Sequence, residues 1–318
     1  MRLHIVDIFW FQAYFLFVKS NFATIGNFFQ QTENGDEVSL KMEEAFIKPE
    51  FFHCDRATSC SRVLKRQGAG HYQTNTEVTP LEEEESVIAA WKKVKQPTDC
   101  KDLYDSGKRD SGIYEIIRPN SNNQVMIVNC DMETDGGGWT VIQRRIDGST
   151  DYQRGWSDYK DGFGDVGKNM WIGLENMHYL ASPDASTTLR IDLKHRLKGD
   201  ELFFATYRSF QISDESDRYR ISVSGYSGTA GDAFNMLPSH MTNNNMVFST
   251  KDSDNDNKLK YNCADTFKGG WWYNGCHNCQ LNGLFPSKDS SDPIYMSWGT
   301  IDDNHGNVNF SEMKIRRN

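Results

Sequence analysis

Three aspartates in alternate positions, Asp252, Asp254 and Asp256, lie shortly before two cysteines, Cys263 and Cys276, that bracket a run of glycines and aromatic residues. Carboxylate oxygens are ligands that a hard cation such as Ca²⁺ prefers. A disulfide could fix the shape of the loop, and the aromatic rings could line a small pocket. This combination indicates a ligand-recognition site built on loops rather than a catalytic centre.

The spacing of the acidic cluster does not fit an EF-hand. A loop of that kind starting at Asp252 would need glycine where Asn257 stands and glutamate where Cys263 stands. We therefore expect a calcium site of another kind. A solvated acidic loop without a metal is the alternative.

Motifs for enzyme catalysis are missing from the sequence. The chain has no Gly-x-Ser-x-Gly nucleophile turn and no His-Glu-x-x-His zinc motif. Gly136-Gly137-Gly138 follows one expected strand and leads into another, so it lacks the helix N-terminus that binds phosphate. We expect a protein without enzymatic activity.

The charge balance argues against nucleic-acid binding, and the cysteines favour an oxidising compartment. The 318 residues carry a net charge of −9, whereas nucleic-acid binders need a basic face. No second Cys-x-x-Cys pair accompanies Cys276-His277-Asn278-Cys279 at the spacing of a zinc ribbon. We therefore expect disulfides with one sulfur left over, from cysteines at 54, 60, 100, 130, 263, 276 and 279.

The first 23 residues are typical of a signal peptide. Met1-Arg2 precedes an aromatic-rich apolar run from Phe9 to Val18, and Ala23 is a candidate cleavage site. The run is shorter than the ~20 residues of a membrane span. We expect a secreted, extracellular protein without a membrane span; an uncleaved anchor and a buried helix are the alternatives.

Residues 24–99 differ from the rest of the chain. They hold polar stretches, the close pair Cys54 and Cys60, and one expected helix over residues 81–95. That helix has glutamates near its start and lysines near its end, as the helix dipole favours. It is too short for a coiled coil, and no Gly-X-Y repeat indicates a collagen stalk. We place the domain boundary at Cys100.

Residues 100–318 read as an α+β domain rich in loops. Residues 125–132 and 139–144 are expected strands joined by a glycine-containing turn at 134–138. Residues 189–193 and 219–223 alternate apolar and polar side chains, as half-buried strands do. After about residue 225 this patterning fades, so the C-terminal part must be held by something other than long strands.

The domain resembles the fibrinogen C-terminal domain of ficolins, tachylectins, tenascins and fibrinogen. The likeness covers residues 100–318 and rests on several separate stretches that follow the order of that family. These are residues 130–145, 147–149, 171–176, 262–264, 270–273, 281–283 and 312–316.

The resemblance implies a fold, two disulfides and a cation. The fold is α+β, with a mixed, mainly antiparallel sheet, short helices and a loop-rich, calcium-binding C-terminal subdomain. The bridges are Cys100–Cys130 and Cys263–Cys276. The Ca²⁺ ligands are the carboxylates of Asp254 and Asp256 with backbone carbonyls around Lys258 and Lys260.

One cysteine departs from the family pattern. Cys279 stands where a small polar residue is more usual. It is a free thiol, a partner for Cys54 or Cys60, or an intermolecular bridge. A local Cys54–Cys60 bridge would leave Cys279 buried and inert.

The resemblance also implies a pocket beside the calcium site, which receives an acetyl group in carbohydrate-binding relatives. The peptide before Cys276 matches the site of a cis bond in those relatives. A serine stands on the far wall where an aromatic residue is expected, which removes an apolar contact for a methyl group. The matching residues are Phe267, Cys276, His277, Ser290 and Ser291.

We therefore expect a secreted calcium-binding recognition protein that binds glycans or acetylated ligands on microbial surfaces in innate defence. The alternative is a matrix or signalling protein that uses the same domain for extracellular protein partners. Single glycan sites bind weakly, so a homo-oligomer would raise the avidity.

Overall fold

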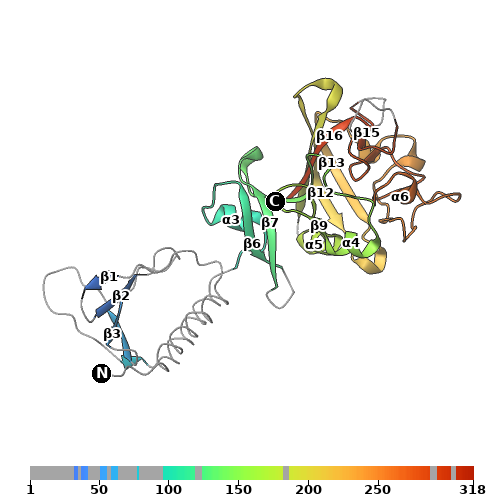
Figure 1. Ribbon diagram of the computed structural model, residues 1–318. Helices are drawn as coiled ribbons and strands as arrows, with labels where there is room; N and C mark the ends of the chain where they lie inside the picture. Colours follow the sequence, from blue (N-terminus) through green and yellow to red (C-terminus); the bar gives the residue numbers. More distant parts are fainter. Residues whose placement is uncertain are drawn as a thin grey trace. The chain divides into compact units, whose positions relative to one another are not determined.

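The computed structural model describes residues 96–118, 124–181, 186–286, 292–301 and 306–318 fully, and the backbone of five short strands between residues 32 and 78. The chain divides into two units, residues 1–95 and 96–318, and each is considered by itself (Figure 1). The expected signal peptide and the expected helix at 81–95 lie outside the described residues. No helix of the described part is long and apolar enough to cross a membrane.

The strands of the first unit form an antiparallel sheet in sequence order. The register of the third and fourth strands places Cys54 opposite Cys60. The strands are β1 (Thr32–Asn34), β2 (Glu37–Lys41), β3 (Phe51–Asp55), β4 (Ser59–Val63) and β5 (Glu77–Val78).

The second unit is organised by a nine-stranded sheet in which neighbouring strands run antiparallel. Two of these nine strands, at the start of the unit, form a hairpin that joins the others through β8. In pairing order, the main path is β13 (Ile221–Gly228), β12 (Leu202–Ile212), β11 (Thr187–His195), β16 (Val308–Arg317), β8 (Trp139–Arg145), β10 (Met170–Trp171) and β9 (Phe163–Gly164); the hairpin is β6 (Gly112–Ile117) and β7 (Val125–Asp131).

The helices of this unit are short, and they lie at its two ends and beside the sheet. Figure 1 shows α3 and the β6–β7 hairpin on one side of the long strands, and α6 among the C-terminal loops on the other. The helices are α3 (Cys100–Asp105), α4 (Trp156–Asp161), α5 (Leu174–Leu180) and α6 (Cys263–Thr266). The predicted α+β fold with a mainly antiparallel sheet and short helices is confirmed.

The expected strands are present with small changes of extent. β7 ends at Asp131, and β8 extends to Arg145. The strand expected at 219–223 starts only at Ile221. Arg218 and Tyr219 have φ values of 52° and 51°, in the left-handed region. The extended backbone of the strand therefore cannot begin until after Tyr219.

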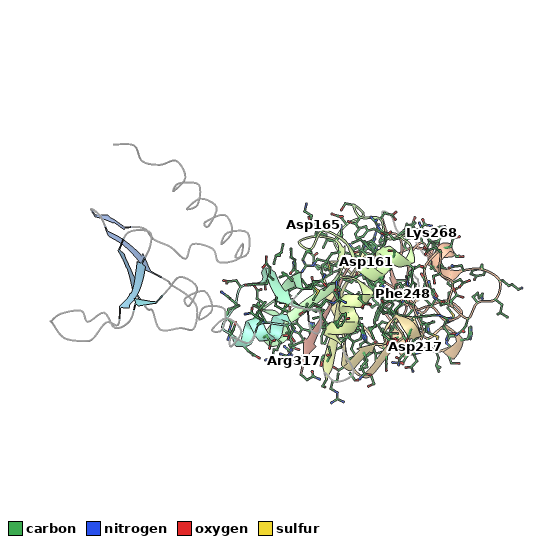
Figure 2. The ribbon with its side chains drawn as sticks, turned by 90° about the horizontal axis from the view of Figure 1, so that it is seen from below. Asp161, Asp165, Asp217, Phe248, Lys268 and Arg317 are labelled. Atoms are coloured by element: carbon green, nitrogen blue, oxygen red, sulfur yellow. A yellow bond between two sulfur atoms is a disulfide. The ribbon has the colours of Figure 1, made fainter. Side chains whose placement is uncertain are left out.

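Aromatic side chains fill the core between the sheet, α4 and the C-terminal loops. Trp171 contacts Tyr159 and Trp272 with ring centroids 5.4 and 6.0 Å apart, and Phe248 lies 5.1 Å from Trp272. Figure 2 shows Phe248 inside the domain, whereas charged residues such as Lys268 lie toward its outside. Trp271 and Trp272, from the aromatic run between Cys263 and Cys276, are both fully buried.

Charged side chains fill the space between the sheet and the β7–β8 turn. The Lys314 ammonium lies 2.6 Å from Asp131, 2.7 Å from Asp192 and 3.2 Å from Glu312. Arg144 pairs with Glu312 from the neighbouring strand. This buried network joins the start of the domain to its central strand β16.

Beyond β13, the chain is held by irregular backbone hydrogen bonds and by side-chain amides that bond to the backbone. Asn243 donates to the Trp272 carbonyl at 2.8 Å and accepts from the N–H of Cys279 at 3.3 Å. Two further short strands, β14 (Cys279–Gln280) and β15 (Ser297–Trp298), pair with each other. Amides therefore replace long strands as the framework of this part, which carries the candidate site.

Candidate calcium and ligand-binding site

The first aspartate of the acidic cluster serves the fold rather than a cation. Asp252 accepts hydrogen bonds from the Trp156 N–H at 2.9 Å and the Thr250 hydroxyl at 2.6 Å. It thereby caps the N-terminus of α4, where Gly155 at the cap position supplies no side chain. A Cβ at Gly155 would lie 2.6 Å from an Asp252 oxygen, so a larger residue there would displace the capping carboxylate.

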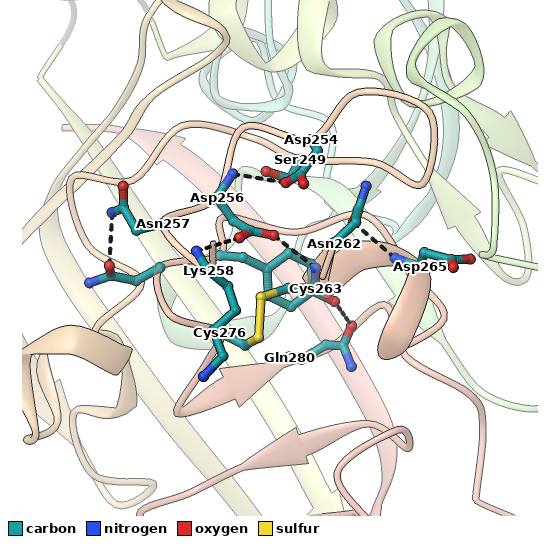
Figure 3. Close-up of a disulfide and its surroundings, with 12 residues drawn as sticks. Ser249, Asp254, Asp256, Asn257, Lys258, Asn262, Cys263, Asp265, Cys276 and Gln280 are labelled. Carbon is teal, nitrogen blue, oxygen red and sulfur yellow. Dashed lines mark hydrogen bonds between the residues drawn. A yellow bond between two sulfur atoms is a disulfide. The ribbon is translucent and has the colours of Figure 1, made fainter. Parts of the chain in front are cut away.

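The other two aspartates lie together at the start of the following loop (Figure 3). The backbone N–H of Asp256 points to an Asp254 carboxylate oxygen at 3.4 Å. The two Asp256 oxygens accept from the N–H groups of Lys258 at 2.7 Å and Cys263 at 2.8 Å. The structure thus brings together the two carboxylates that the resemblance implies as calcium ligands.

The electrostatics of this pair favour a cation. Burial raises the pKa of Asp256 to about 6, and the nearby Asp254 carboxylate contributes to the rise, against two backbone hydrogen bonds that lower it. A positive ion between the carboxylates would oppose both effects, because it favours their charged forms.

The remaining oxygens of the loop fit a hard cation. Within the described residues, no hydrogen bond uses the carbonyl oxygens of Lys258 or Lys260. The Lys258 ammonium lies 5.5 Å from the centroid of the Tyr261 ring, in a cation–π contact. No cluster of three or more His, Cys, Asp or Glu side chains in the described part could hold a metal. A cation here would take carboxylate, carbonyl and water oxygens, as calcium does.

A disulfide joins the acidic loop to the expected pocket. Cys263 is bonded to Cys276, with Cα atoms 5.6 Å apart, and Cys100 is bonded to Cys130. These are the two pairings that the resemblance implies. Because Cys263 also donates its N–H to Asp256, a single residue fixes both the acidic loop and the segment at 276.

Two expected pocket side chains are nearly enclosed. His277 is 3% exposed and meets the Phe267 ring edge-on, with centroids 4.6 Å apart. Cys276 is 4% exposed, and its backbone N–H has no hydrogen-bond partner within the described residues. Phe267 is half-buried and faces Tyr273 at 6.3 Å. Ser290 and Ser291 lie outside the described residues.

The peptide before Cys276 differs from the expectation. Among the described residues, only Leu237–Pro238 has a cis peptide bond, so Gly275–Cys276 is trans and that expectation is wrong. The trans form is the ordinary one, since a cis bond without proline costs about 3–4 kcal/mol. Here Gly275 donates to the His240 carbonyl at 2.8 Å, and Cys276 accepts from Asn274 at 2.7 Å.

Two asparagines that the sequence reasoning missed connect the acidic loop to this segment. Asn257 donates its backbone N–H to the Asn274 carbonyl and its side-chain amide to the Asn274 side chain, both at 2.9 Å. Asn274 in turn donates to the Ser239 carbonyl at 3.0 Å. The abundance of asparagine after residue 225 was the available signal, but it did not show which side chains meet.

The extra cysteine is enclosed in the domain. Cys279 is fully buried without a disulfide, and its thiol donates to Asn243 Oδ1 at 3.4 Å. Burial raises the pKa of this thiol well above its ordinary value. Of the expected alternatives, the structure shows the free, inert thiol.

These features agree with a family comparison. The family model described as "Fibrinogen beta and gamma chains, C-terminal globular domain" matches residues 96–318. The chain belongs to the fibrinogen C-terminal domain family.

Similar proteins share this domain but extend well beyond it. The chain is 41% identical over 229 residues to "Fibrinogen C domain-containing protein 1-B" of Xenopus laevis, covering 70% of this chain and 47% of that protein. It is 40% identical over 220 residues to human "Tenascin-R", covering 69% of this chain and 15% of that protein. The chain therefore spans less than half the length of these relatives.

A solved structure shows the same fold with a ligand. Lamprey fibrin D-dimer, in complex with the peptide Gly-His-Arg-Pro-amide, superposes with a TM-score of 0.64 and 30% sequence identity. The match covers 74% of this chain and 82% of that one.

Proposed function

We propose that this chain is a secreted, non-enzymatic recognition protein that uses calcium to bind glycans or acetylated surface ligands in innate defence. The observation that carries the proposal is the junction at Cys263. Its N–H orients Asp256, and its sulfur holds Cys276. One hydrogen bond and one disulfide therefore connect the carboxylate that would bind the cation to the segment that would receive a ligand.

In this proposal, one set of residues binds the cation and another set contacts the ligand. Asp254 and Asp256 would hold the cation together with the carbonyls of Lys258 and Lys260. Bound calcium would supply positive charge that offsets the repulsion between the two carboxylates. The N–H of Cys276, without a partner in the described part of the chain, can donate to a ligand carbonyl, and the half-buried Phe267 ring offers an apolar surface.

The direct test is retention of the full chain on immobilised N-acetylglucosamine and on acetylated serum albumin. We expect retention in calcium and elution by a chelator or by free N-acetylglucosamine. Asp254→Asn combined with Asp256→Asn should abolish the calcium dependence. Asp265→Asn is the matched control, because this exposed acid lies in the same region without facing the loop carboxylates. Binding that is unaffected by chelator would contradict the proposal.

A second candidate function, binding of a protein partner, is favoured by exposed apolar side chains next to the same loop. Leu259 is fully exposed and Tyr261 is 44% exposed, between and beside the lysines whose carbonyls would bind calcium. The lamprey fibrin structure holds a peptide. Retention on matrix or receptor proteins that Leu259→Ser weakens, with no retention on any glycan, would support this alternative.

Oligomerisation would strengthen either activity, since several weak sites that are linked together bind with higher avidity than a single site. The buried Cys279 does not offer an exposed thiol for an intermolecular bridge. We therefore assign any homo-oligomer to residues 24–95. Sedimentation of the full chain, compared with a fragment that starts at Gln96, would test this assignment.

A further inference from the structure

A buried glutamine on the central sheet bonds to the segment beside the candidate pocket. Gln143 of β8 has no exposed surface. Its Oε1 accepts from the Ser311 hydroxyl at 3.0 Å, and its Nε2 donates to the Leu281 carbonyl at 3.0 Å and to Asn282 Oδ1 at 3.2 Å. The side-chain hydrogen bonds of Gln143 therefore connect Ser311 of β16 to residues 281–282.

An arginine two residues further along the strand reaches the same segment. Arg145 is 2% exposed, and its Nη1 donates to the carbonyls of Gly283 at 2.9 Å and Leu281 at 3.3 Å. Its guanidinium lies 3.9 Å from the centroid of the Tyr152 ring.

This arginine carries a buried charge that Asp147 and Asp151 attract without forming an ion pair with it. No carboxylate among the described residues forms an ion pair with Arg145, and its Nε has no hydrogen-bond partner there. Burial lowers the pKa of the guanidinium. Burying a charge without a directly paired opposite charge is costly, so an apolar side chain would serve packing better at this position. What Arg145 provides is a pair of donors aimed at one turn.

The opposite side of the turn bonds to the pocket wall. Asn282 donates to the Gly270 carbonyl at 2.9 Å, and Gln280 donates to the Phe267 carbonyl at 3.1 Å. A Cβ at Gly269 would lie 2.0 Å from the Asn282 carbonyl oxygen, which shows how closely the two segments approach. Residues 280–283 are thus clamped between β8 and residues 267–270.

We infer that Gln143 and Arg145 are positioning residues for the ligand pocket. They touch no ligand. Through residues 280–283 they fix the Phe267 backbone, and hence the ring that packs against His277, relative to the sheet. This inference rests on the proposed function, because it assigns Phe267 to the wall of the binding site.

The test separates positioning from general stability. Gln143→Met keeps the length of the side chain but removes the amide, and Arg145→Lys keeps the charge but offers one compact donor group in place of the planar guanidinium. The matched control is Thr140→Val on the same strand. Thr140 is also buried, but its hydroxyl accepts from the Cys100 N–H at 3.1 Å, at the far end of the domain.

Two measurements on the full chain decide the outcome. The first is the Kd for acetylated serum albumin by surface plasmon resonance, at a temperature where all variants are folded. We expect it to rise about tenfold in Gln143→Met, as for one buried hydrogen-bonding group that loses its partner. The rise should be smaller in Arg145→Lys and absent in Thr140→Val. Equal affinity in Gln143→Met and wild type, or losses that follow Tm in all three variants, would overturn the inference.

The second measurement needs no ligand. Amide hydrogen exchange in residues 264–283 should become faster in Gln143→Met and stay unchanged in Thr140→Val. Unchanged exchange in Gln143→Met would refute the positioning role. If the wild-type protein does not bind acetylated albumin, the proposed function fails, and the exchange data still decide whether these residues position the segment.

Discussion

The backbone N–H of Cys263 donates a 2.8 Å hydrogen bond to the Asp256 carboxylate, while the Cys263 sulfur is bonded to Cys276. One residue therefore belongs to both the acidic loop and the expected ligand segment (Figure 3). In a region with little regular secondary structure, such a junction transmits order from one loop to the other. The cation and the disulfide are expected to act on the same piece of structure.

Under the proposed calcium binding, removing this disulfide should abolish the effect of calcium on stability. The bridge spans a sequence separation of 13, which a chain-entropy estimate values at about 3 kcal/mol of unfolding free energy. In Cys263→Ser combined with Cys276→Ser, the Asp256 carboxylate is no longer held by a fixed N–H. We expect a lower Tm and no rise in Tm when calcium is added, as measured by thermal unfolding in calcium and in chelator.

The other disulfide is the control for this experiment. Cys100–Cys130 has a sequence separation of 30 and joins α3 to β7. Replacing both of its cysteines by serine should lower Tm while the calcium-induced rise persists. Loss of the calcium effect in both double variants, or in neither, would show that the junction at Cys263 has no special role.

The only N-glycosylation sequon, Asn309-Phe310-Ser311, should remain unmodified. It lies in β16, where the Ser311 hydroxyl is buried and donates to Gln143 at 3.0 Å. Asn309 Oδ1 is buried without a hydrogen-bond partner in the described part of the chain. We expect no change in mass when the protein, expressed through the secretory pathway of a eukaryotic cell, is treated with peptide N-glycosidase F. A loss of glycan mass that Asn309→Gln abolishes would contradict this prediction.

Local patterns in the sequence were sufficient to predict the β7–β8 pair and β11. In these segments, apolar and β-branched residues alternate or cluster next to glycine turns, so neighbouring residues determine the structure. Residue types and spacing pointed to the region around Asp254 and Cys263, and the family resemblance supplied the expected ligand set and the disulfide pairing. The long strand β12 and the short helices α4 and α5 were not predicted, because the two helices start at glycines without side-chain caps.

Long-range roles could not be predicted from the sequence. The sequence groups Asp252 with the other two aspartates of the acidic cluster, but its carboxylate caps a helix that begins 96 residues earlier. Lys314 lies in a strand where alternation would place a lysine in solvent, yet it is buried among carboxylates. Such roles depend on which segments become neighbours in the fold, and the pairing of distant segments cannot be derived from a single sequence.

The buried network predicts how stability depends on pH at the acid end. Burial alone would raise the pKa of Asp131, but hydrogen bonds from Lys314 and Thr134 lower it more, so it falls well below its ordinary value of 3.8. A carboxyl group with a lowered folded-state pKa stabilises the fold fully above its unfolded pKa. This contribution disappears as the pH falls below about 3.8 and the group is protonated. We expect the urea midpoint to fall less steeply below this pH in Asp131→Asn than in wild type.

The control for the pH series is Asp200→Asn. Asp200 is exposed and lies 4.0 Å from Lys194, and exposed pairs of this kind contribute little. Its pH profile should follow that of the wild type. If the urea midpoints of Asp131→Asn and Asp200→Asn fall with decreasing pH as steeply as that of the wild type, the network does not contribute to stability in acid.

Replacing Lys314 itself should cause the largest loss of stability among these variants. Burial lowers the pKa of this ammonium, but Glu312, Asp192 and Asp131 raise it more, so the group stays charged. Lys314→Met would leave three carboxylates without their shared cation, and breaking a buried ion pair in this way costs about 3–5 kcal/mol. Lys194→Met, at an exposed pair, should cost less than about 1 kcal/mol. Urea unfolding gives both values, and adding Asp131→Asn to Lys314→Met should recover part of the loss. Equal losses at the two lysines would mean that water reaches the network and screens it.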